Sequence, residues 1–182
     1  RGSSTRPLTV GYIGRFDPIK GVGDLARAIA RTPGATPIHF RFHGPVRNTA
    51  ELLVLEDLKK AVGSGAWVTF GAELDAHEVQ KALAGIDVVC CPSRVVEGGP
   101  TIALEAMAAG VPVVGTNVPG ISEIVEDGVT GRLVAPGNPR ALAAVFAELA
   151  ADPGVIDRWR AALPRVRSMD DVTNDYLQMY EA

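Results

Sequence analysis

The sequence predicts an α/β fold, a single doubly wound, Rossmann-like domain with about six parallel strands and helices on both faces. Short runs of strand-forming residues alternate with helical patterns along most of the 182 residues. The run Asp87-Val-Val-Cys-Cys-Pro92 is apolar at successive positions, which is typical of an interior strand covered on both sides. The length and a hydrophobic content of 47% suit one core.

Six short segments have the composition of strands and are bounded by glycine, proline or polar residues. In order they are Leu8–Ile13, Ile38–Phe42, Trp67–Phe70, Val88–Cys91, Pro112–Gly115 and Arg132–Val134. Between them, apolar residues recur at helical spacing over Val22–Arg31, Ala50–Val62, Ala76–Leu83, Thr101–Ala109 and Ile121–Glu126. After Pro139 the pattern predicts helices alone, over Arg140–Ala151, Val155–Ala162 and Asp170–Tyr180.

Composition and charge exclude several classes of protein. A net charge of −3 and a pI near 5.6 lack the basic excess of a nucleic-acid-binding protein, so no nucleic-acid partner is expected. No apolar stretch approaches the roughly 20 residues of a membrane span, and the chain does not begin with a hydrophobic signal. Cys90 and Cys91 are adjacent in an apolar run and are expected to be buried, reduced thiols. These features predict a cytoplasmic protein.

The domain is expected to occupy residues 7–182. Residues 1–6 begin Arg-Gly-Ser-Ser-Thr rather than with methionine, so they are interpreted as an expression remnant or a linker.

The most informative segment is Glu97-Gly-Gly-Pro-Thr-Ile-Ala-Leu-Glu105, in which two carboxylates flank a turn that opens a helix. The free amides and the dipole at a helix start attract anions. Gly98 and Gly99 let a phosphate approach the main chain, and Pro100 suits the first helical position, ahead of Thr101. The two acids are interpreted as acceptors for hydroxyls of a ribose and a sugar. The segment therefore predicts a cradle for a sugar nucleotide.

A second candidate loop, Gly14 to Gly21, follows the first predicted strand. In open parallel sheets, ligands bind beyond the carboxyl ends of the strands, where this loop and the Gly98 turn should meet. The guanidinium of Arg15 fits phosphate oxygens, and Lys20 offers a second cation at the next helix. Ordinary solvated charges remain the alternative for both residues, and ordinary helix charges remain the alternative for Glu97 and Glu105.

Other kinds of chemistry lack a sequence signature. His39, His43 and His77 are not spaced as metal ligands, and no Asp-x-Asp pair is present, so neither a metal nor a cofactor is expected. Neither a Gly-x-Ser-x-Gly elbow nor a Gly-x4-Gly-Lys-Ser/Thr loop occurs, which disfavours hydrolases and NTPases.

Several segments share their order and spacing with one family. They are Gly14-Arg15 with Lys20-Gly21, Val68-Thr-Phe-Gly71, Cys91-Pro-Ser93, the acids Glu97 and Glu105 with the following Ala-Met-Ala-Ala-Gly110, and Pro119-Gly120 to Gly131. From Leu8 to Glu181 the chain resembles the C-terminal, donor-binding half of group 1, family 4 glycosyltransferases of the GT-B fold. Many members have an aromatic or another apolar residue where this chain has Gly99.

The resemblance implies a function and a division of roles. Enzymes of this kind transfer a sugar from a nucleotide-diphosphate sugar to an acceptor hydroxyl, without a metal and with retention of configuration. It implies that Glu97 contacts the donor sugar and Glu105 the ribose. Arg15 and Lys20 would then neutralise the diphosphate, helped by Gly14 and by the amides of Gly98 to Thr101.

The resemblance also implies that an N-terminal domain supplies the acceptor wall. The acceptor, a sugar, lipid or small molecule, and any membrane association would depend on that half, so this chain alone is expected to be inactive. Two alternatives are a non-catalytic sugar-nucleotide-binding module and a GT-B sugar-nucleotide epimerase.

Overall fold

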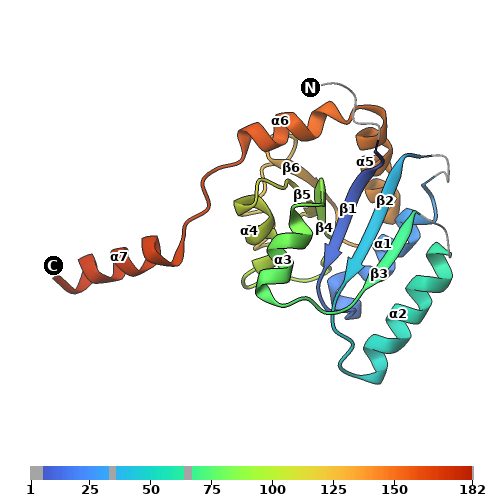
Figure 1. The fold of residues 1–182 in the computed structure, drawn as a ribbon, viewed down its shortest axis with the longest axis horizontal. Coiled ribbons are helices and arrows are strands. Elements are labelled where there is room, and N and C mark those ends of the chain that lie inside the picture. Colours follow the sequence, from blue (N-terminus) through green and yellow to red (C-terminus); the bar gives the residue numbers. More distant parts are fainter. Residues whose placement is uncertain (1–5, 33–35, 64–66, 182) are drawn as a thin grey trace.

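In a computed structural model, which describes residues 6–32, 36–63 and 67–181, the six predicted strands form one parallel sheet (Figure 1). The expected remnant at residues 1–6 lies, apart from Arg6, outside the described residues. The strands are β1 (Leu8–Ile13), β2 (Ile38–His43), β3 (Val68–Gly71), β4 (Val88–Cys91), β5 (Val113–Thr116) and β6 (Gly131–Val134). Their order, β3-β2-β1-β4-β5-β6, confirms the doubly wound, Rossmann-like prediction.

The helices cover both faces of the sheet, as Figure 1 shows. They are α1 (Val22–Ile29), α2 (Thr49–Val62), α3 (Ala76–Leu83), α4 (Thr101–Ala108), α5 (Pro139–Ala151), α6 (Gly154–Ala162) and α7 (Met169–Glu181), with a short 3-10 helix, η1 (Pro18–Lys20). Helix α1 packs beside both α2 and α5, whereas α3 and α4 lie on the opposite face.

Local sequence explains where several helices begin. The side chains of Asn48, Asp75 and Asn138 each accept a hydrogen bond from a backbone amide in the first turn of α2, α3 and α5. In α3 the cap is reciprocal, because the Glu78 side chain also accepts from the Asp75 amide. These caps fix the helix starts to within a residue or two of the sequence prediction.

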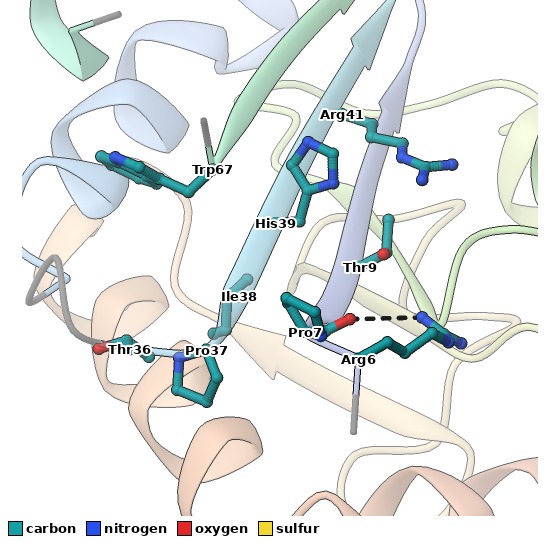
Figure 2. Close-up of a pocket in the computed structure, with 9 residues that line it drawn as sticks. All are labelled: Arg6, Pro7, Thr9, Thr36, Pro37, Ile38, His39, Arg41 and Trp67. Carbon is teal, nitrogen blue, oxygen red and sulfur yellow. Dashed lines mark hydrogen bonds between the residues drawn. The ribbon is translucent and has the colours of Figure 1, made fainter. Parts of the chain in front are cut away.

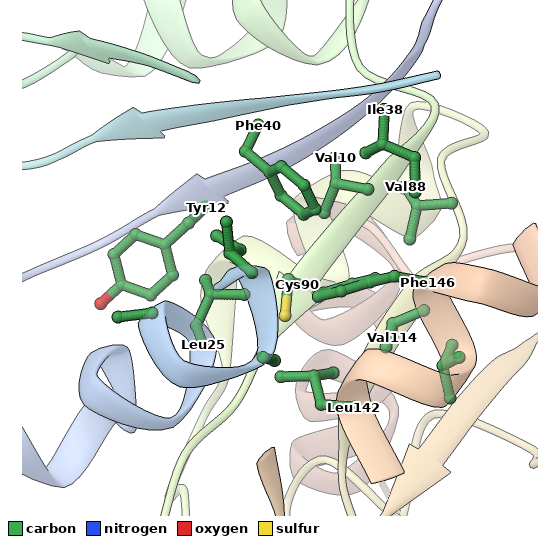
Figure 3. Packing of buried hydrophobic residues seen from close by; sticks show 14 of the residues in the cluster. Val10, Tyr12, Leu25, Ile38, Phe40, Val88, Cys90, Val114, Leu142 and Phe146 are labelled. Atoms are coloured by element: carbon green, nitrogen blue, oxygen red, sulfur yellow. The ribbon is translucent and has the colours of Figure 1, made fainter. Parts of the chain in front are cut away.

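The core is divided by the sheet. On one face, Val88 and Cys90 of β4 pack with Phe40 and Phe146, whose rings meet edge to face with centroids 5.1 Å apart (Figure 3). On the other face, Val89 and Cys91 pack against α3 and α4. Successive β4 residues thus enter two different clusters, which explains why this strand is apolar throughout.

One predicted helix is wrong. Residues 121–124 form turns rather than a helix, Val125 and Glu126 have no regular structure, and Asp127 then forms an isolated bridge. The apolar spacing that suggested a helix instead serves the core, because Ile121 and Val125 are both buried in the cluster under α3 and α4. The segment is too short to form a stable helix without a favourable cap and the strong packing of a long apolar face.

At the carboxyl-terminal end, α7 follows an extended segment and stands away from the rest of the domain (Figure 1). Its prediction as a helix is confirmed. Large apolar side chains remain exposed along it, namely Met169, Tyr176, Leu177, Met179 and Tyr180.

None of the described helices is long and apolar enough to cross a lipid bilayer.

Candidate functional site

The sheet order places β1 and β4 side by side, although α1, β2 and the elements up to α3 separate them in the sequence. The strand order reverses here, and the loops after the two strands therefore leave the sheet in opposite directions. A cavity of about 250 Å³ lies between these loops and is called the switch-point cavity below. Its lining includes seven of the nine predicted site residues: Gly14, Arg15, Lys20, Glu97, Gly99, Pro100 and Thr101.

Gly21 allows the loop after β1 to lie directly against the loop after β4. Its φ of 72° is left-handed, and a Cβ built on it would lie 1.8 Å from the carbonyl oxygen of Pro92. The Arg94 amide also donates to the Ile19 carbonyl over 2.8 Å. This close approach of two backbones brings Lys20 to the wall of the cavity.

Lys20 and Glu97 form an ion pair across the cavity. The Lys20 Nζ lies 2.8 Å from both carboxylate oxygens of Glu97. The hydroxyl of the buried Ser93 donates to Glu97 Oε1 as well. Glu97 is therefore oriented by two side chains that both donate to it. Ser93 belongs to the Cys91-Pro-Ser93 segment, but the sequence assigned it no role in the site.

The loop after β5 fixes the backbone of Glu97. The Glu97 amide donates to the Pro119 carbonyl over 3.0 Å. A Cβ on Gly120, whose φ is 89°, would lie 1.9 Å from the Glu97 carbonyl oxygen. The Pro119-Gly120 turn therefore holds the backbone of Glu97 in place.

Gly98 and Gly99, in the turn before α4, have more free space around them than Gly21 and Gly120. A Cβ on Gly98 or Gly99 would meet nothing within 4 Å, and neither residue has a positive φ. Neither backbone strain nor packing therefore requires glycine at these positions. The missing side chains leave space beside the cavity, as expected where a ligand approaches the main chain.

Pro100 lies one residue earlier in the helix than the sequence predicted. It is the N-cap of α4 rather than its first helical residue, with φ −75° and ψ 73°. These angles are those of an inverse γ-turn, and the Thr101 amide donates to the Gly99 carbonyl over 2.8 Å. In this conformation the Thr101 amide has a protein partner instead of facing an anion.

Arg15 lines the cavity but is held by a carboxylate that the sequence analysis missed. Its Nε and Nη2 donate to Glu51 Oε1 over 2.9 and 2.6 Å, while Asp17 lies 3.2 Å from Nη2. Glu51 is 1% exposed, in the first turn of α2. The spacing Asn48-x-x-Glu51 resembles a capping box, which was the available signal, but the Glu51 carboxylate turns to Arg15 and to the Arg47 amide.

A second buried carboxylate supports the same pair of loops. Asp24, in the first turn of α1, accepts from Arg94 Nε and Nη2 over 2.6 and 2.8 Å and from Arg27 over 2.6 Å. The hydrogen bond from Arg94, followed by that from Arg27, holds the pKa of Asp24 below its ordinary value of 3.8. Asp24 thus stays ionised at neutral pH and ties the loop after β4 to α1.

Two predicted residues are absent from the lining of the cavity. Gly98 is exposed in the turn before α4, and Glu105 is exposed on α4 one turn beyond Thr101. The chain therefore brings together the cations, the first glutamate and the turn, but not the second glutamate.

Cys90 and Cys91, at the end of β4, also contribute to the lining of the switch-point cavity. Both are buried and free, and burial raises the pKa of the Cys91 thiol to about 12. Within the described residues, no group of three or more His, Cys, Asp or Glu side chains is arranged to hold a metal ion.

A larger hollow, called the amino-end pocket below, has a volume of about 390 Å³. It lies at the amino ends of the strands, opposite the ends that carry the switch-point cavity. Its lining is drawn from β1, β2 and the segment before β3 (Figure 2): Arg6, Pro7, Thr9, Thr36, Pro37, Ile38, His39, Arg41 and Trp67. Ligands of open parallel sheets bind at the carboxyl ends of the strands, so the smaller cavity is the better candidate.

The strand order and the cavity at the reversal point define a Rossmann-like domain with a cavity at its switch point. The family described as glycosyl transferases group 1 matches residues 1–164. The chain belongs to this family, as the sequence resemblance implied.

Relatives of known name support this membership. The chain is 31% identical over 169 residues to a D-inositol 3-phosphate glycosyltransferase of Rhodococcus jostii, covering 90% of this chain and 37% of that protein. It is 32% identical over 174 residues to a glycogen synthase of Mycobacterium tuberculosis, covering 94% of this chain and 40% of the relative. The chain thus spans well under half the length of these relatives.

Solved structures show the same fold. A sucrose-phosphate synthase from Thermosynechococcus elongatus superposes with a TM-score of 0.82 at 28% identity, covering 96% of this chain and 45% of that one. The C-terminal domain of a group 1 family protein, LpcC, from Francisella tularensis gives 0.74 at 26% identity and 94% and 88% coverage. Anabaena Alr3699/HepE, solved with UDP-glucose, has the same fold, with a TM-score of 0.82, 22% identity and 96% and 49% coverage.

Proposed function

We propose that residues 7–182 are the donor-binding domain of a retaining, metal-independent, cytoplasmic glycosyltransferase of family 4. The whole protein would transfer a sugar from a nucleotide-diphosphate sugar to an acceptor hydroxyl. The observation that carries this proposal is the convergence of Arg15, Lys20 and Glu97 with the Gly99-Pro100-Thr101 turn on one cavity. The group 1 membership and the UDP-glucose complex of a protein with the same fold support the choice of ligand.

The diphosphate is assigned to the space between Arg15, Lys20 and the open turn at Gly98 and Gly99. Negative charge grows on the diphosphate as the anomeric C–O bond breaks, so cations fixed there stabilise the transition state more than the ground state. Gly14, directly after β1, lines this space with its backbone alone. No metal is needed in this arrangement, because two side-chain cations supply the charge.

Lys20 and Glu97 change partners in this mechanism. Without donor, they neutralise each other at 2.8 Å. With donor, the Lys20 ammonium binds phosphate and the Glu97 carboxylate, still held by Ser93, accepts from a sugar hydroxyl. Glu97 then fixes the orientation of the sugar, which lowers the entropic part of the barrier.

Glu105 is assigned to the ribose. Its place on α4, one turn beyond the phosphate-binding turn, is the support for this role, together with the family resemblance. The acceptor is assigned to an N-terminal half of the protein, as is any membrane association. The exposed apolar side chains of α7 suit a helix that packs against that half.

The test is a calorimetric titration of this chain with UDP-, GDP- and ADP-sugars, repeated on Lys20→Ala and Glu105→Ala. One nucleotide should bind in the micromolar to millimolar range, and each substitution should weaken it about tenfold or more. Glu123→Ala, on the exposed turn after β5, is a matched control and should bind as the wild type does. If no sugar nucleotide binds, or both site substitutions leave affinity unchanged, the proposal is wrong.

Catalysis needs a separate test on the whole protein. With the preferred donor and a panel of acceptors, product formation should persist in excess EDTA and the new bond should retain the donor's anomeric configuration by NMR. Binding without transfer to any acceptor would favour a non-catalytic module instead, and release of an epimerised sugar would favour an epimerase.

A further inference from the structure

We infer that Glu51 is a positioning residue that holds the guanidinium of Arg15 at the wall of the switch-point cavity. This inference rests on the proposed function, in which Arg15 binds the donor diphosphate. It concerns a carboxylate on α2, outside the loops that line the cavity.

The burial of Glu51 is the first observation. A carboxylate with 1% exposure is costly unless its oxygens are satisfied, and both are. Oε2 accepts from the Arg47 amide over 2.7 Å, and Oε1 accepts from Arg15 Nε and Nη2. The hydrogen bond from the Arg47 amide, followed by that from Arg15, lowers the pKa of Glu51, which therefore stays ionised at neutral pH.

The geometry of Arg15 is the second observation. Its side chain is 45% exposed, so it is free on one side, while two of its donors are fixed by Glu51 on the other. The backbone is fixed too, since the buried Tyr12 hydroxyl donates to the Arg15 carbonyl. A long arginine side chain normally loses much rotamer freedom when it binds an anion, and the bonds to Glu51 restrict Arg15 before the ligand arrives.

The N–H groups of Arg15 that Glu51 does not use remain available to bind a ligand. A guanidinium has five N–H donors, and Glu51 uses one on Nε and one on Nη2. The others remain for Asp17 and for a phosphate, so holding Arg15 does not use up its binding capacity. Glu51 also partly neutralises Arg15, and a carboxylate that only competed with the phosphate for Arg15 would have the opposite effect. The two effects predict opposite changes in affinity.

The test compares Glu51→Gln with the wild type, using the intact chain and UDP, GDP and ADP as probes in calorimetry. Glutamine keeps the volume and one acceptor but removes the charge. The dissociation constant of the best-bound nucleotide should rise about tenfold. In an Arg15→Ala background, Glu51→Gln should have no further effect, because Glu51 acts through Arg15. Glu73→Gln removes another arginine-paired glutamate, exposed beside Arg47, and should leave affinity unchanged.

Affinity that is unchanged or tighter in Glu51→Gln would overturn the inference, as would an equal loss with and without Arg15. The second result would indicate a general structural role.

A measurement without nucleotide separates this inference from the proposed function. In ¹⁵N NMR, the Arg15 Nε–H should be protected from solvent exchange in the wild type and lose this protection in Glu51→Gln, whereas Arg41 Nε–H should be unaffected. If protection is observed but no nucleotide binds, Glu51 positions Arg15 and the proposed function fails. If the wild-type Arg15 Nε–H exchanges as fast as that of Arg41, the positioning role is wrong whatever binds.

Discussion

Two hollows of this domain, the amino-end pocket and the switch-point cavity, are built differently. The amino-end pocket is the larger, about 390 Å³ against about 250 Å³, yet its arginine–carboxylate pair, Arg6 with Asp87, is exposed on the arginine side. The switch-point cavity is enclosed by backbones that touch at Gly21 and Gly120, and its arginine is held by a carboxylate buried to 1% exposure. Volume alone therefore does not identify the site. Interlocked loops and buried charges are the features that favour the switch-point cavity as the proposed site.

The largest expected effect is on the interlocked loops. Gly21→Ala would place a Cβ in a left-handed residue against the Pro92 carbonyl oxygen, and should lower the free energy of unfolding by about 3 kcal/mol. Gly98→Ala is the matched control, because nothing lies within 4 Å of its Cβ, and should change stability by less than about 0.5 kcal/mol. Urea denaturation measures both. Equal effects would show that the loops are not interlocked.

The second effect compares two arginine–aspartate pairs. Asp24→Asn removes the charge that two arginines share at 3% exposure, and should cost about 2 kcal/mol at pH 7. Arg6→Ala removes an exposed partner and should cost less than about 1 kcal/mol. Because the folded pKa of Asp24 is depressed, its stabilisation is present above pH 3.8 and is lost as the pH falls through the folded value. A difference between wild type and Asp24→Asn that grows in acid would contradict this.

The third effect separates the hollows by ligand affinity. Gly99→Val places a side chain in the open space of the switch-point cavity and should weaken binding of a nucleoside diphosphate about tenfold without lowering the melting temperature. The corresponding change at the amino-end pocket, Thr36→Val, should leave affinity as it is. Calorimetry on both variants tests the assignment. Weakening by Thr36→Val alone would move the site to the other edge of the sheet.

The smallest effect is expected from α7. Its apolar residues are exposed, whereas Leu163 and Val166 before it pack against the core. Deleting residues 169–182 should therefore shift the melting temperature by less than about 2 °C and leave nucleotide affinity unchanged. A large loss of stability by calorimetry would show that α7 packs on this domain in solution.

Most of the fold could be predicted from the sequence because strands such as β4 and capped helices such as α3 carry local signals. The turn at Ile121–Glu126 could not, because burial of Ile121 and Val125 has the same spacing in a helix and in this packed turn. Seven site residues were brought together as expected, since parallel strands deliver their loops to one edge. Glu51 and Asp24 were missed because their partners, Arg15 and Arg94, are 36 and 70 residues away.

The central claim is that a diphosphate binds in the switch-point cavity, against the turn that opens α4. Backbone amide NMR of this chain during titration with the best-bound nucleoside diphosphate tests it most directly. The largest shift changes should fall on Gly14, Gly98, Gly99 and Thr101, where the Thr101 amide would leave the Gly99 carbonyl. Changes centred on His39 and Trp67, or no changes at saturating nucleotide, would contradict the account.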